Sequence, residues 1–99
     1  MSMQIVKAAQ AGTVESSDIV VKIEPCERGI VIELTSSVKQ QYGAKIESVI
    51  RETLNELGVT AARVEAVDKG ALDCTVKART QAAAFRAADT QDYPWKTNG

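Results

Sequence analysis

The chain has 99 residues, and its 12 basic and 13 acidic side chains leave a net charge of −1. This length indicates a single domain, residues 1–99, and the balanced charge argues against binding to DNA, RNA or an anionic membrane surface. No apolar run approaches the ~20 residues that cross a bilayer, and no signal-peptide core opens the sequence, so we expect a cytoplasmic protein.

The first third of the chain predicts two strands. Residues 1–18 are small and polar, which favours an arm or an edge strand. Residues 19–23 and 30–34 are rich in β-branched side chains, as strands are. The stretch between them, 24–29, holds a proline and a glycine and predicts a turn. Because this connection is short, we expect the two strands to pair as an antiparallel hairpin.

A long helix is predicted next, over 38–57. Its mostly apolar positions recur at steps of three and four residues, which places them on one face. These positions are Val38, Tyr42, Ile46, Val49, Ile50, Thr53, Leu54 and Leu57. Ser37 with Gln40 fits a capping box at the start of the helix, and Gly58 fits a left-handed residue after its end.

Alternating side chains predict two further strands, 61–67 and 71–77, joined by a turn at 68–70. Residues 79–88 favour a short C-terminal helix, and residues 89–99 form a polar tail. The complete pattern is ββαββα. It predicts an α+β domain in which an antiparallel sheet carries the long helix on one face.

The segment Gly12-Thr13-Val14-Glu15-Ser16-Ser17-Asp18 is the first candidate site. Two hydroxyls, Ser16 and Ser17, lie between two carboxylates, and a third, Thr13, follows a glycine, in a chain that has no histidine. Serine triads and thiol–imidazole pairs need a histidine, so the sequence indicates no catalytic residue of this kind. A serine without a base is still suited to covalent modification by another enzyme. The alternative interpretation is an ordinary turn, which these residue types also favour.

The segment Asp68-Lys69-Gly70-Ala71-Leu72-Asp73-Cys74 is the second candidate. Interpreted as a tight hairpin, it sends Leu72 and Cys74 into the core. Interpreted as a functional surface, it presents Lys69 and Asp73 to a partner or to a bound arm.

Three other side chains bear on function. Cys26 and Cys74 are too few for a zinc site, and we expect two reduced thiols, although the sequence leaves a disulfide open. Trp95, in the tail, is consistent with packing on the body of the domain or with docking on a partner.

Together, the two candidate segments resemble the acyl carrier protein of citrate lyase, its small gamma subunit. The similarity covers most of the chain and includes Ile5-Val6-Lys7 and Ala78-Arg79. The resemblance implies that Ser16 carries a covalently attached 2'-(5''-phosphoribosyl)-3'-dephospho-CoA, joined through a phosphodiester. Ser17 is the rival, because local chemistry does not separate two adjacent hydroxyls.

The same resemblance implies a set of partners. An alpha subunit would exchange acetyl for citryl on the thiol of the attached group, releasing acetate. A beta subunit, which uses magnesium, would cleave the citryl thioester to oxaloacetate, and a dedicated transferase would install the group. The carrier itself would bind no metal and would be no enzyme.

Three alternatives remain at this level. They are a carrier for a related citramalate lyase, a non-covalent module that binds a partner through its helix face or Trp95, and an independent small enzyme. A fatty-acid carrier does not fit, since those proteins are helical bundles with an Asp-Ser-Leu motif. This chain has Glu15-Ser16-Ser17-Asp18 and clear strand patterns instead.

Overall fold

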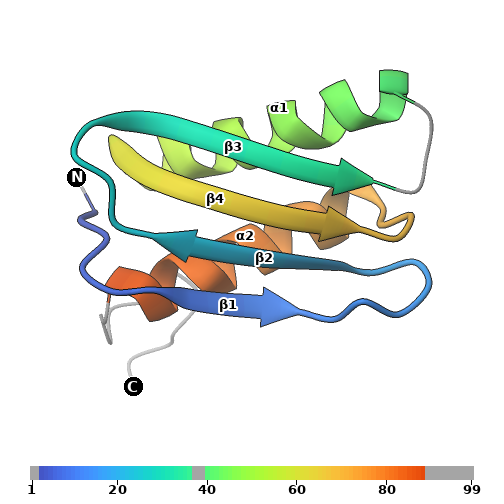
Figure 1. Ribbon diagram of the computed structural model, residues 1–99, viewed down its shortest axis with the longest axis horizontal. Helices are drawn as coiled ribbons and strands as arrows, with labels where there is room; N and C mark the ends of the chain where they lie inside the picture. The colour runs from blue at the N-terminus through green and yellow to red at the C-terminus, as the bar shows by residue number, and fades with distance from the viewer. Residues whose placement is uncertain (1–2, 37–39, 89–99) are drawn as a thin grey trace.

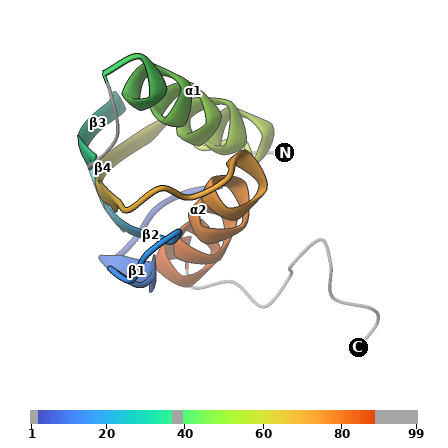
Figure 2. The same cartoon turned by 90° about the vertical axis from the view of Figure 1, so that its right-hand side faces the viewer.

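The computed structural model describes residues 3–36 and 40–88. One four-stranded sheet is covered on one face by two helices, and no described residue outside the sheet covers its other face (Figures 1 and 2). The elements in chain order are β1 (Ala9–Gly12), β2 (Ile19–Glu24), β3 (Gly29–Ser36), α1 (Gln40–Glu56), β4 (Ala61–Asp68) and α2 (Asp73–Ala88). The predicted α+β class is confirmed.

The order of the strands differs from the prediction. The sheet runs β1-β2-β4-β3, with β2 antiparallel to β1 and β4, and with β3 parallel to β4. The predicted hairpin of 19–23 with 30–34 is therefore wrong, as is the purely antiparallel sheet. β4 lies between these two strands because α1 serves as the crossover that a parallel pair requires, and it returns the chain beside β3.

The predicted strand over 71–77 is also wrong, because α2 begins at Asp73. Only Val76 of its three presumed core residues is buried, while Leu72 is 70% exposed and Cys74 is exposed. The buried positions of α2 mostly recur at helical spacing; they are Val76, Thr80, Ala83, Ala84, Phe85 and Ala87. α2 has 16 residues and is not the short helix predicted over 79–88.

The long helix was predicted closely. α1 spans Gln40–Glu56, and Gly58 follows it with a φ of 80°, the left-handed conformation expected there. The Gly58 amide donates to the carbonyl of Asn55 at 3.0 Å. The proposed cap at Ser37 lies outside the described residues, as does the tail over 89–99 with Trp95.

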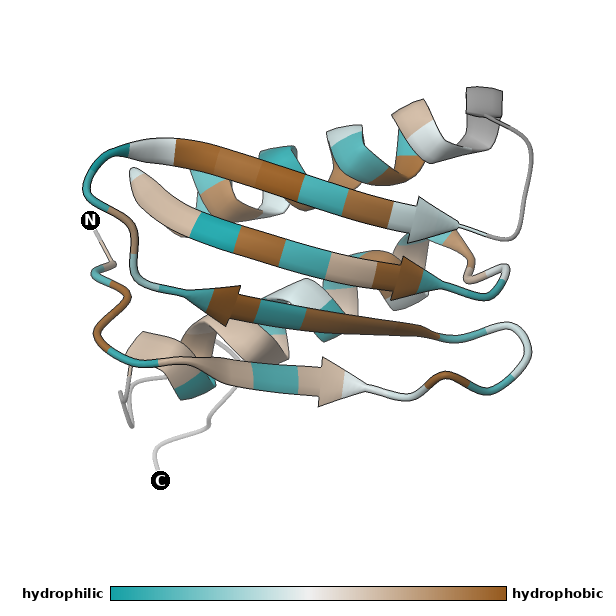
Figure 3. Cartoon of the chain, viewed as in Figure 1, coloured by the Kyte–Doolittle hydropathy of each residue, from teal (hydrophilic) through white to brown (hydrophobic). Residues whose placement is uncertain are grey.

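The core lies between the sheet and the helices. Along β2 and β4, buried residues alternate with more exposed ones, so one set faces the helices, and hydrophilic residues interrupt the hydrophobic ones on both strands (Figure 3). The buried set includes Ile19, Val21 and Ile23 of β2, Ala62, Val64 and Ala66 of β4, and Ile46, Ile50 and Leu54 of α1. α1 packs on β3, α2 packs on β1 and β2, and the two helices contact each other. Each fully buried Ile or Leu side chain contributes about 1.5–3 kcal/mol to stability.

Candidate attachment site

The serine-bearing loop, residues 13–18, joins β1 to β2 at one end of the sheet (Figure 1). The loop follows Gly12, the last residue of β1. Its φ of 102° suits glycine, and a Cβ there would overlap the carbonyl oxygen of Ile19. The Asp18 amide donates to the Glu15 carbonyl at 3.2 Å, which closes a four-residue turn with the two serines at its centre. The loop is therefore a defined turn, and it follows β1, which lies at the edge of the sheet within the range expected to be an arm or an edge strand.

The two serines differ in backbone conformation. Ser17 has a φ of 64°, in the left-handed region that non-glycine residues rarely adopt. This is the position of a type II turn at which glycine is favoured. Both serines are exposed.

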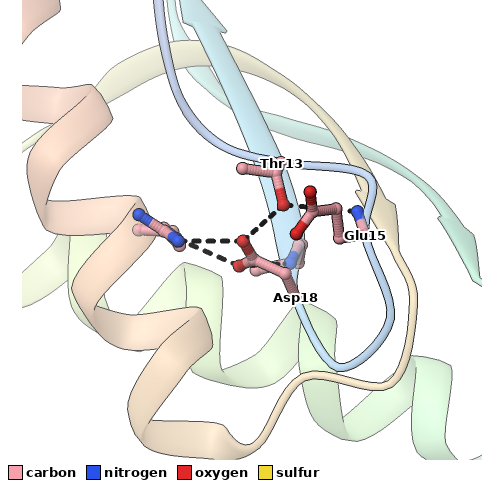
Figure 4. Close-up of polar contacts among 5 residues, drawn as sticks. Thr13, Glu15 and Asp18 are labelled. Carbon is pink, nitrogen blue, oxygen red and sulfur yellow. Dashed lines mark hydrogen bonds and ion pairs between the residues drawn. The ribbon is translucent and has the colours of Figure 1, made fainter.

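Asp18 holds the base of the loop. Arg79, on α2, donates through Nε to Asp18 Oδ1 at 3.0 Å and through Nη2 to Oδ2 at 2.8 Å. Thr13 Oγ1 donates to the same Oδ2 at 2.7 Å, and the amide of Ile19 donates to Oδ1 at 2.7 Å (Figure 4). In turn, Thr13 Oγ1 accepts a bond from the amide of Glu15 at 3.2 Å. One carboxylate thus joins both ends of the loop to a helix.

These contacts stabilise the ionised form of Asp18. The hydrogen bonds from Arg79, then from Thr13 and from the Ile19 amide, hold the pKa of the Asp18 carboxyl well below its ordinary value. The same pair raises the pKa of Arg79. Because the Asp18 side chain is only 14% exposed, this pair is shielded more than an ordinary surface ion pair.

The two candidate segments meet in the structure. β2 and β4 pair antiparallel as far as Ile19 and Asp68. Beyond this pair, backbone hydrogen bonds continue between the two loops at this end of the strands. The Lys69 amide donates to the Asp18 carbonyl at 2.9 Å, and the Ser17 amide donates to the Lys69 carbonyl at 2.8 Å. The β4–α2 loop, residues 69–72, therefore lies directly against the serine-bearing loop.

Asp68 shapes this second loop. Its side chain is fully buried and accepts bonds from the amides of Gly70 at 3.1 Å and Ala71 at 3.0 Å. The hydroxyl of Ser36 donates to Asp68 Oδ2 at 3.0 Å, which ties the loop to the end of β3. Gly70 has a positive φ, 96°, which suits glycine, and it leads into a helix and not into the hairpin strand expected from the sequence.

Three other residues singled out from the sequence lie at the same end of the molecule. Lys69, Asp73 and Cys74 are all exposed, and Asp73 is 3.7 Å from Lys45 of α1. Both cysteines are free, Cys26 included, so no disulfide joins them. Within residues 3–36 and 40–88, no group of three His, Cys, Asp or Glu residues could hold a metal ion.

Sequence reasoning missed the role of Arg79. It is 61 residues from Asp18, and nothing in its local sequence pairs it with that carboxylate. Placing the start of α2 correctly would have been the one signal in the sequence that pointed to this role of Arg79. A helix that begins at Asp73 places Arg79 on its second turn, at the end where the two loops meet.

Comparisons with known proteins place the chain in a family. A family model described as "ACP: Malonate decarboxylase delta subunit (MdcD)" matches residues 6–87. The citrate lyase acyl carrier protein of Streptococcus mutans is 57% identical over 95 residues, which cover 95% of this chain and 93% of the relative. The chain belongs to the citrate lyase acyl carrier protein family.

Other members and a solved structure agree. The citrate lyase acyl carrier protein 2 of Salmonella typhimurium is 56% identical over 94% of this chain and 97% of its own. A chain in the crystal structure of a Pseudomonas malonate decarboxylase hetero-tetramer with malonate has a TM-score of 0.73 at 22% identity, covering 87% of this chain and 90% of that one. That likeness shows a shared fold.

Membership in the family defines the class of function. The protein is an acyl carrier, a non-catalytic subunit, and the family implies a covalently attached prosthetic group and a multi-subunit complex. None of the described helices is both long and apolar enough to cross a bilayer. An exposed hydroxyl on a firmly held turn suits covalent attachment, since a modifying enzyme must reach the oxygen from solvent.

Proposed function

We propose that Ser16 carries the prosthetic group, 2'-(5''-phosphoribosyl)-3'-dephospho-CoA, in the carrier subunit of a cytoplasmic citrate lyase. The carrier would pass acetyl and citryl thioesters between an alpha subunit that exchanges acyl groups and a beta subunit that cleaves citryl. The observation that carries this proposal is the position of Ser16, an exposed hydroxyl in the turn closed between Glu15 and Asp18.

The backbone favours Ser16 over Ser17. The amide of Ser17 is bonded to Lys69, and its left-handed φ is a conformational requirement of the turn. Ser16 stands one residue further from this anchor. We therefore assign the chemical role to Ser16 and the conformational role to Ser17.

Attachment is a displacement at phosphorus. A bond forms between Ser16 Oγ and the phosphorus of an activated phosphoribosyl donor, while the leaving group of the donor departs. The hydroxyl proton passes to a base on the transferase, since this chain has no histidine to accept it. Once bound, the group supplies the thiol for thioester chemistry, and the chain supplies a rigid anchor that keeps each acyl group at high effective concentration near the catalytic subunits.

Mass spectrometry of protein coexpressed with the transferase tests the assignment. Wild-type protein should gain the mass of the group on the peptide that contains Ser16, and Ser16→Ala should gain none. The matched control is Ser17→Gly, which removes the second hydroxyl while keeping the left-handed φ available. It should be modified normally and should support cleavage of citrate.

Modification of Ser16→Ala at Ser17, with activity retained, would overturn the assignment. Cleavage of citrate by unmodified protein would overturn the carrier role itself. Assays of the loaded complex with citrate and with citramalate identify the substrate, and the proposal requires citrate.

A further inference from the structure

We propose that Val14 and Leu72 form a docking surface for the enzyme that joins the prosthetic group to Ser16; this inference rests on the proposed attachment at Ser16. Val14 lies in the serine-bearing loop, and Leu72 lies in the β4–α2 loop just before the helix begins. The two loops lie together at one end of the sheet (Figures 1 and 3).

Their exposure is unusual for this molecule. Four large hydrophobic side chains are exposed in the described part of the chain: Val6, Val14, Val31 and Leu72. Leu72, at 70%, and Val14, at 62%, are the most exposed of the four. A single exposed apolar residue needs no explanation, but the two most exposed ones lie in the two loops that bond to each other beside the candidate attachment serine.

The ladder between the loops fixes their relative position. Ser17 and Lys69 form its last bond, at 2.8 Å, and beyond it both segments leave the sheet at the same end. Val14 lies three residues before Ser17, and Leu72 lies three residues after Lys69. Val14 and Leu72 therefore lie in two loops whose backbones are bonded to each other, each three residues from that bond.

Both loops are held in place before any partner binds. Asp18 fixes one through its two bonds to Arg79, and Asp68 fixes the other through the amides of Gly70 and Ala71. A preorganised surface loses little conformational entropy when it docks, so burial of its apolar side chains contributes more fully to affinity.

The geometry of the reaction selects the occupant. To form the bond at Ser16 Oγ, the modifying enzyme must bring its reacting atom to about 3–3.5 Å from that oxygen, so its surface must cover the residues beside Ser16. The catalytic subunits react with a thiol at the far end of the attached arm, and they have no need to cover this loop. Val14 and Leu72 would then fill an apolar recess at the edge of the transferase active site.

Loading kinetics test this surface. With purified transferase and donor, intact mass gives kcat/KM for modification of wild type, Val14→Ser and Leu72→Gln. We expect each substitution to lower kcat/KM about tenfold or more, as loss of a buried interface anchor does. Leu72→Met, which retains an apolar side chain of similar volume, should keep most of the rate.

Val6→Ser is the matched control, because Val6 is also an exposed valine, at 58%. Its amide bonds the carbonyl of Ala87, near the far end of α2, which is about 20 Å from Asp73 at ~1.5 Å per residue. The Val6→Ser variant should therefore be modified at the wild-type rate. Thermal melting run in parallel should show all four variants folded, since each site is exposed.

Each of three outcomes would overturn one part of the argument: the docking surface, the attachment site or the choice of partner. Wild-type loading of both Val14→Ser and Leu72→Gln overturns the docking surface, while wild-type mass gain at Ser16 leaves the proposed function intact. Mass gain by Ser16→Ala overturns the assignment of the attachment site to Ser16, on which this inference rests. If fully loaded Leu72→Gln carrier also turns over slowly in the lyase complex, the surface belongs to a catalytic subunit, and the assignment to the transferase is wrong.

Discussion

Arg79 and Asp18 are 61 residues apart in the sequence, yet they are joined by two hydrogen bonds of 3.0 and 2.8 Å. This paired contact ties the second turn of α2 to the base of the serine-bearing loop. Bidentate arginine–carboxylate contacts fix geometry as well as distance. The base of the loop that bears the candidate attachment serine is therefore fixed by a helix on the covered face of the sheet.

Breaking this contact should impair loading of Ser16. Arg79→Gln and Asp18→Asn are each expected to lower the melting temperature and kcat/KM for modification, and the double variant should be little worse than either one, because the two side chains act together. Measurements are thermal melting and intact mass. Arg63→Gln is the control, since Arg63 forms only partly exposed pairs with Glu33 and Glu24 on the open face. Equal behaviour of Arg63→Gln and Arg79→Gln would contradict the prediction.

Acid should weaken the same contact. Asp18 has a folded-state pKa below its ordinary value of 3.8, so its contribution is complete above that pH and is lost as the pH falls through 3.8 and below. The difference in free energy of unfolding between wild type and Asp18→Asn should stay constant between about pH 5 and pH 8 and shrink in more acidic solution. Urea titrations across this range measure it. A difference that persists unchanged in acid would show that the carboxylate charge is not what stabilises the loop.

Two glycines should respond oppositely to alanine. At Gly12, φ is 102° and a Cβ would overlap the Ile19 carbonyl, so Gly12→Ala should destabilise the fold by at least about 1 kcal/mol. At Gly43, inside α1, the nearest atom to a Cβ is Leu34 Cδ2 at 3.8 Å, an ordinary contact. Gly43→Ala should therefore stabilise by about 0.5–1 kcal/mol, since glycine is costly within a helix. Urea unfolding checks both signs, and a neutral Gly12→Ala would mean that the start of the loop is not constrained as described.

Removal of the Asp68 carboxylate should destabilise the β4–α2 loop. Asp68→Ala leaves the amides of Gly70 and Ala71 and the Ser36 hydroxyl without this acceptor, at a cost of about 1–3 kcal/mol. Hydrogen exchange should also become faster at the two amides. Asp73→Ala is the control, because its pair with Lys45 is exposed at 3.7 Å, and its effect should stay within about 0.5 kcal/mol. Similar losses in the two variants would argue against a specific role for Asp68.

Local patterns predicted most elements well. Residues 19–23 and 30–34 were recognised as strands from their β-branched side chains, and residues 61–67 from alternation, because both signals lie within a short window. α1 was predicted from its helical period, and Gly58 was predicted as the left-handed residue after it. The error over 71–77 arose where Leu72, Cys74 and Val76 imitate alternation. Exposure of Leu72 and Cys74 was visible only in the fold.

The amino-acid sequence by itself determined the α+β class, the absence of a histidine base and the resemblance to a family of acyl carriers, because composition and short motifs need no neighbours to be recognised. The tertiary structure alone decided that β4 lies between β2 and β3, that the loop at Ser16 rests against Lys69, and that Asp18 is held by Arg79. Each of these depends on segments far apart along the chain. Strand order and ion-pair partners follow from how the helices and the sheet bury their apolar faces against each other. Short stretches of sequence do not contain this information.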